Sequence, residues 1–164
     1  MNVAIVMGSD SDLSSMQGAI DILNEFGVDH TVRCVSAHRD PHGMLEFASQ
    51  AASNGVDVII AGAGGAAHLP GMIASATELP VIGVPVRRPA FDGLDALLSI
   101  VQMPAGIPVA TMAVDGSANA ALFAVRILAR SDEGLRAQLQ NYAAELKDVV
   151  ATKDARLRAQ PGRE

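Results

Sequence analysis

Short apolar runs alternate with amphipathic stretches along most of this chain. The runs are continuous rather than alternating, as expected of parallel strands buried on both faces. The predicted strands are residues 3–7, 31–35, 57–61, 80–84 and 109–114. Between and after them, apolar residues recur at helical spacing. The predicted helices are residues 13–26, 41–52, a short one ending near 77, then 94–101, 119–129 and 132–153.

Strands separated by helices imply right-handed crossovers and a parallel sheet covered on both faces. We therefore predict an α/β fold, a three-layer αβα sandwich with a five-stranded sheet of flavodoxin-like order 2-1-3-4-5 and an extra C-terminal helix. Residues 1–155 are expected to form one domain that includes that helix. Residues 156–164 are expected to form a polar tail. In this strand order, the loops after the first three strands meet where ligands bind in open parallel sheets.

The loop after the second predicted strand carries the most informative motif, Ser-Ala-His-Arg-Asp-Pro, at residues 36–41. Asp40 and Pro41 predict a helix start. His38 is then a proton carrier beside the cation Arg39, where a helix N-terminus favours an anion. The alternatives are a solvated histidine, an Arg39–Asp40 pair, and a metal site with His42, which lacks a nearby third ligand.

Two further loops have unusual composition. Gly8 to Asp12 offers a tight turn, hydroxyls for a phosphate and a carboxylate for ribose hydroxyls, although Ser11 or Asp12 could simply cap the next helix. Residues 62–71 are rich in glycine and alanine, and these small residues let backbone approach a flat ligand. The spacing loosely matches a dinucleotide fingerprint but follows the wrong strand, so a nicotinamide site is rejected. His68 enters this pocket or is a histidine satisfied inside the core.

Composition narrows the function classes. The chain has 164 residues and a net charge of −6, which disfavours non-specific binding of nucleic acid. No apolar run reaches the ~18 residues of a membrane-spanning helix. Only 18% of residues are charged, which suggests that other subunits cover part of the surface. The only lysines are Lys147 and Lys153, so the predicted core holds no Schiff-base lysine, and a single cysteine, Cys34, fits a cytoplasmic protein.

Four segments closely resemble the class I N5-carboxyaminoimidazole ribonucleotide mutases of purine biosynthesis, the PurE family. These segments are residues 8–12, 36–39, 61–72 and 94–104, within a similarity that spans about residues 3–128. The combination of Ser-Ala-His-Arg with Gly-Gly-Ala-Ala-His-Leu-Pro-Gly-Met is highly specific. The related class II carboxylases, which use CO2 directly, typically have Ser-Ala-His-Lys, so Arg39 favours class I.

The resemblance implies a role for each matching residue. His38 matches the catalytic histidine. Ser9, Ser11, Asp12 and Arg39 match positions that hold the phosphate and ribose of the substrate. The positions that line the base and carboxylate pocket are matched by Ser36, Ala37, Ala63, Gly64, Ala66, His68 and Leu69. The family implies a homo-octamer with a small ribonucleotide substrate and no metal or organic cofactor. It also implies that residues 1–155 are the catalytic domain and that the C-terminal helix packs on neighbouring subunits.

Two positions depart from the family pattern. Leu13 stands where tryptophan is common, and we expect it on the apolar face of the first helix. Residues 113–117 form a shorter loop than the glycine-rich stretch of many members. Two other functions stay open: a carboxylase that uses CO2 directly, and a non-catalytic nucleotide-binding module.

Overall fold

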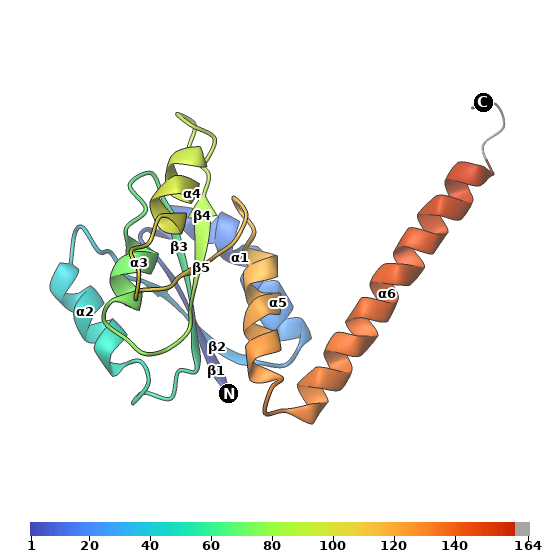
Figure 1. The fold of residues 1–164 in the computed structure, drawn as a ribbon, viewed down its shortest axis with the longest axis horizontal. Coiled ribbons are helices and arrows are strands. Elements are labelled where there is room, and N and C mark those ends of the chain that lie inside the picture. The colour runs from blue at the N-terminus through green and yellow to red at the C-terminus, as the bar shows by residue number, and fades with distance from the viewer. Residues whose placement is uncertain (160–164) are drawn as a thin grey trace.

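A computed structural model describes residues 1–159 of the chain. A five-stranded parallel sheet of order β2-β1-β3-β4-β5 forms its centre, so the predicted fold class is confirmed (Figure 1). The strands are β1 (Asn2–Met7), β2 (Asp29–Cys34), β3 (Val58–Gly64), β4 (Val81–Val86) and β5 (Ala110–Thr111).

Two helical layers cover the sheet. The helices are α1 (Leu13–Glu25), α2 (Pro41–Gln50), α3 (Leu69–Ala74), α4 (Leu94–Val101), α5 (Ser117–Leu128) and α6 (Glu133–Arg158), and a short 3-10 helix η1 (Asp10–Asp12) precedes α1. One core packs α1 and α5 on side chains such as Ile5 and Ile60, and the other packs α2, α3 and α4 on Val6 and Ile59. Residues adjacent in β1 and β3 thus face opposite cores, as a pleated strand requires.

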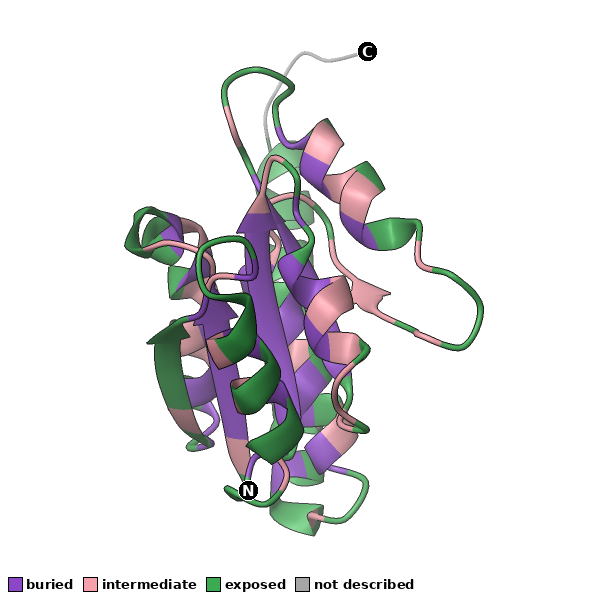
Figure 2. Cartoon of the chain, turned by 90° about the vertical axis from the view of Figure 1, so that its left-hand side faces the viewer, coloured by how far each residue is buried: buried purple, intermediate pink, exposed green. Residues whose placement is uncertain are grey.

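The central strands are buried and β2 is an exposed edge. Figure 2 shows β1 and β3 in purple and β2 in green. Cys34 lies on this exposed edge strand. A central strand loses contact with water on both faces, which explains why β1, β3 and β4 could be recognised as continuous apolar runs.

β5 is much shorter than the predicted strand at residues 109–114. Pro85 of β4 lacks the N–H group that would continue the ladder with β5. The Asp115 N–H donates to the Pro85 carbonyl oxygen at 2.8 Å, so the chain stays beside β4 without a regular pairing. β5 is therefore shorter than predicted but occupies its predicted place in the sheet.

Two other expectations need correction. Leu13 is 42% exposed, and the buried face of α1 instead carries Met16, Ala19 and Leu23. The first turn of α1 starts at the carboxyl edge of the sheet, where the described residues cover Leu13 only in part. The last helix continues to Arg158, into the predicted polar tail, and residues 160–164 of that tail lie outside the described residues.

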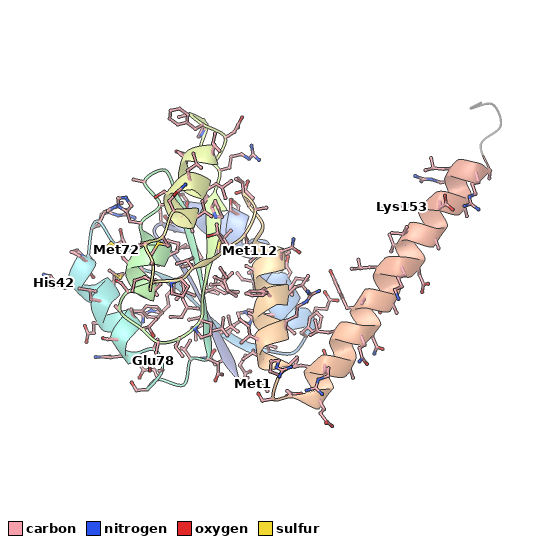
Figure 3. All side chains as sticks on the ribbon, viewed as in Figure 1. Met1, His42, Met72, Glu78, Met112 and Lys153 are labelled. Carbon is pink, nitrogen blue, oxygen red and sulfur yellow. The ribbon has the colours of Figure 1, made fainter. Side chains whose placement is uncertain are left out.

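The helix α6 projects away from the sheet (Figure 1). Only Leu135 of this helix is buried. Lys153 lies on its far half, distant from the strand ends (Figure 3). Among residues 1–159, no helix combines the length and the apolar character that crossing a bilayer demands.

Candidate active site

A cavity of about 140 Å³ opens at the carboxyl edge of the sheet. Loops that follow β1, β2, β3 and β4 form its walls, at the switch point of the strand order. Its lining comprises Gly8, Ser9, Asp12, Ser36, Ala37, His38, Ala63, Gly64, Ala66, His68, Leu69 and Arg88. The structure thus brings together every predicted site residue except Ser11 and Arg39, which do not line the cavity but hydrogen-bond to residues that do.

A larger groove of about 460 Å³ lies elsewhere, between β2 and α2. It includes Ser36 but neither His38 nor His68. Size alone would favour this groove as a ligand site. The smaller cavity is the better candidate for chemistry because both histidines face it.

The central pair of the cavity is His38 and His68. His38 Nε2 lies 2.8 Å from His68 Nδ1, and the two rings meet edge to face at 83°. A hydrogen bond between two imidazole nitrogens needs one donor and one acceptor, so these facing nitrogens share a single proton. Both side chains are exposed to the cavity, which excludes the alternative of a core histidine at His68. The pair can therefore pass a proton to a bound molecule.

Arg39 connects two of the loops. Its guanidinium donates to the Gly8 carbonyl oxygen and, through Nε at 3.2 Å, to the Ser36 hydroxyl. Asp40 is not its partner, because the Asp40 carboxylate caps α2 by accepting from the Gly43 N–H at 2.9 Å. Arg39 thus holds the loops after β1 and β2 together and brings a positive charge to the cavity wall.

In the loop after β1, one polar residue caps a helix and another lines the cavity. The Ser9 hydroxyl accepts from the Ser11 N–H and from the Ser11 hydroxyl, at 3.3 and 3.0 Å, and so caps η1. Asp12 occupies the N-cap position of α1, but its carboxylate makes no capping hydrogen bond. The carboxylate lines the cavity instead.

The glycines at the carboxyl end of β3 serve packing as well as access. A Cβ on Gly62 would lie 2.4 Å from Met16 Sδ, so this glycine makes room for α1 rather than for a ligand. Ala63, Gly64 and Ala66 do line the cavity. The expected close approach of backbone to a ligand therefore applies to Gly64 and not to Gly62.

The segment after β4 is tied to the loop after β5 by an ion pair. The Arg87 N–H and Nε donate to the two Asp115 carboxylate oxygens at 3.1 and 3.2 Å. Burial alone would raise the pKa of Asp115, but hydrogen bonds from Arg87 and Ser15 outweigh it and leave that pKa below its ordinary value. Asp115 therefore stays charged in neutral solution and holds Arg87 in place.

Sequence reasoning missed one charged residue of the cavity, Arg88. Its guanidinium Nη2 lies 2.5 Å from Asp12 Oδ1. The signal was available, because Arg88 follows β4 just as the other cavity residues follow their own strands. The fourth strand was predicted to end at residue 84, but it ends at Val86.

The alternative of a metal site at His38 and His42 would need a third ligand. His42 does not line the cavity. Within the described part of the chain, no group of three or more His, Cys, Asp and Glu side chains is arranged to hold a metal ion.

Comparison with known proteins gives consistent results. The family model described as AIR carboxylase matches residues 2–149. The N5-carboxyaminoimidazole ribonucleotide mutase of Mycobacterium leprae is 60% identical over 155 residues, covering 94% of this chain and 91% of that protein. The mutase of the same name from Mycobacterium tuberculosis is 56% identical and covers 98% and 92%. The crystal structure of Treponema denticola PurE matches with a TM-score of 0.85 at 26% identity, covering 95% and 98%.

Proposed function

The chain belongs to the AIR carboxylase family, and we propose that its cavity carries out the mutase reaction for which its relatives are named. The protein is an isomerase of purine biosynthesis that converts N5-carboxyaminoimidazole ribonucleotide into 4-carboxy-5-aminoimidazole ribonucleotide. The observation that carries the catalytic assignment is the His38–His68 pair in a cavity walled by small residues.

The reaction moves a carboxyl group from the exocyclic nitrogen to carbon 4 of the imidazole. The nitrogen–carbon bond of the carbamate breaks, the nitrogen gains a proton, and CO2 is released into the cavity. Carbon 4 then attacks CO2, and the ring proton leaves as the new carbon–carbon bond forms. His38 gives the first proton and takes the second, so that no net proton is consumed.

The cavity wall supports the retention of CO2. Ala63, Gly64 and Ala66 offer no polar side-chain group, and Leu69 is buried beside them. CO2 needs no strong hydrogen-bond partner, whereas water does. A small apolar wall therefore keeps CO2 beside the ring while it disfavours entry of water.

The polar residues at the β1 end of the cavity hold the rest of the nucleotide. Ser9, Ser11 and Arg39 bind the phosphate, and Asp12 accepts hydrogen bonds from the ribose hydroxyls. Binding energy from the phosphate then orients the ring against His38. Support comes from the positions of Ser9, Ser11 and Asp12 at the starts of η1 and α1, and from the hydrogen bond that joins Arg39 to Gly8 of the same loop.

A mutase assay on freshly prepared carbamate substrate tests this function. We expect conversion to the 4-carboxy product without added bicarbonate. With labelled CO2 in the buffer, we expect far less label in the product than product formed, because the migrating CO2 stays bound.

The two rival functions give different results in the same assay. A carboxylase would require bicarbonate together with aminoimidazole ribonucleotide and would not use the carbamate. A nucleotide-binding module would bind the ribonucleotide in a calorimetric titration but would exchange no proton at carbon 4. Either result would replace the mutase assignment.

We further propose that the chain forms the homo-octamer that the family resemblance implies. Leu146, Val149, Val150 and Leu157 of α6 are between 48% and 66% exposed, on a helix that projects from its own domain. Ligand pockets usually measure about 300–1,000 Å³, so a 140 Å³ cavity is small for a ribonucleotide. A neighbouring chain would cover the apolar side chains and complete the cavity.

Sedimentation velocity tests the assembly. We expect the 16.9 kDa chain to sediment as an assembly of eight. Val150→Glu places a charge on the exposed apolar side of α6 and should shift the protein towards smaller species, whereas Asp148→Ala should not. A parent protein that sediments as a monomer would contradict the proposal.

The cytoplasmic location stays a prediction.

A further inference from the structure

Asp12 carries a buried carboxylate that its own helix does not use. Its side chain is only 3% exposed, and it makes no capping hydrogen bond to α1. A buried carboxylate is costly unless a charged partner or several donors satisfy it. A partner outside α1 must therefore balance the charge of the Asp12 carboxylate.

The compensation comes from Arg88, which is 76 residues away in the sequence. Arg88 Nη2 lies 2.5 Å from Asp12 Oδ1, and the Arg88 side chain is 38% exposed. Within residues 1–159, no other donor makes a hydrogen bond to this carboxylate. One oxygen of Asp12 is thus occupied, and its charge is balanced inside the cavity.

The path of Arg88 is fixed by the residues beneath it. The side chain crosses the end of β3, where a Cβ on Gly64 would lie 2.8 Å from Arg88 Nε and 3.1 Å from Cγ. Its neighbour Arg87 is anchored to Asp115, which in turn donates its N–H to Pro85. Arg88 therefore leaves β4 from a backbone that is held on both sides and passes over a position that has no side chain.

We propose that Arg88 is a positioning residue that orients Asp12 towards the ribose hydroxyls of the substrate. With Oδ1 bound to Arg88, the carboxylate cannot rotate freely, and Oδ2 remains to accept from a sugar hydroxyl. This inference rests on the proposed function, because it takes the bound molecule to be a ribonucleotide. It adds that the Asp12–Arg88 pair makes the site selective for ribose over deoxyribose.

Kinetics with two substrates test this role. We would measure kcat and KM on the ribonucleotide and on its 2′-deoxyribose analogue for the parent, Asp12→Asn and Arg88→Met. Loss of a charge-assisted contact predicts that Arg88→Met raises KM for the ribonucleotide about tenfold. The KM for the deoxy analogue should change less, because that analogue lacks the 2′-hydroxyl and offers Asp12 only the 3′-hydroxyl to accept from.

Matched variants separate positioning from general damage. Arg88→Lys should recover part of the ribose selectivity, and adding Arg88→Met to Asp12→Asn should cause little further loss. Arg126→Ala, which removes an exposed arginine on α5, should leave both KM values unchanged. If Arg88→Met folds poorly, as shown by circular dichroism, Arg88→Gln keeps a donor towards Asp12 and is measured instead.

Two outcomes overturn the inference. Equal losses on the two substrates would mean that Arg88 contacts another part of the substrate, and no loss on either would mean that the ion pair only serves folding. If Asp12→Asn removes ribose selectivity while the Arg88 variants keep it, this inference fails and the proposed function stands. If the parent neither binds nor converts the ribonucleotide, the proposed function itself fails.

Discussion

Replacement of His38 by asparagine should abolish turnover and leave ribonucleotide binding nearly unchanged. Asparagine is close in size and keeps a hydrogen-bond group near His68, but it cannot carry a proton at neutral pH. General acid–base catalysis contributes about 10²–10⁴-fold, and here one residue serves both proton transfers. We therefore expect kcat to fall by at least about a thousandfold, while the Kd from calorimetry changes only slightly.

His42→Asn is the matched control for this substitution. His42 lies four residues further along the chain, on the exposed surface of α2, and does not line the cavity. Its loss should leave both kcat and Kd at parent values. Near-normal turnover of His38→Asn would remove His38 from the mechanism and shift attention to His68 as the group that moves the proton.

The location of the candidate site could be predicted from the strand pattern alone. The carboxyl ends of β1, β2 and β3 meet at one edge, so residues 8–12, 36–39 and 63–69 had to lie close together once the strand order was given. The caps were equally readable. Asp40 and Pro41 start α2 as predicted, and Gly27, with a positive φ angle of 63°, follows the end of α1 as predicted. The end of α2 differs, because the helix stops at Gln50 and Gly55, with a φ angle of 79°, closes the turn that follows.

The pairing of charged side chains could not be predicted. The sequence leaves an Arg39–Asp40 pair open as one alternative, but a carboxylate at an N-cap is already engaged by the helix N–H groups. Arg39 reaches Gly8 instead, in the loop after the neighbouring strand β1. Arg88 meets Asp12 for a similar reason, since both sit after adjacent or near-adjacent strands. Such contacts depend on side-chain paths over a sheet edge, which no local pattern encodes.

The length of β5 also depends on a neighbouring strand and could not be predicted from its own residues. A run of apolar residues predicts a strand, but whether its ladder forms depends on the donors of its neighbour. Pro85 removes one of these donors. The proline was visible in the sequence, but its effect on residues 112–114 required the register between β4 and β5.

Arg39→Ala should weaken substrate binding strongly and affect the chemical step less. The guanidinium is the cation that joins the loops after β1 and β2, and the phosphate is proposed to bind beside it. Hydrogen bonds to charged groups are worth about 1.5–3 kcal/mol each, so loss of one phosphate contact predicts a rise in KM of about ten- to a hundredfold.

The dephosphorylated nucleoside distinguishes a phosphate anchor from a loop support. If Arg39 binds the phosphate, Arg39→Ala should weaken binding of the ribonucleotide while the already weak binding of the nucleoside stays the same. Arg33→Ala is the matched control, because Arg33 precedes the same loop but stacks over Phe47 outside the cavity. An unchanged KM would contradict the anchor. Equal weakening of nucleotide and nucleoside would mean that Arg39 acts by holding Gly8 and Ser36 in place.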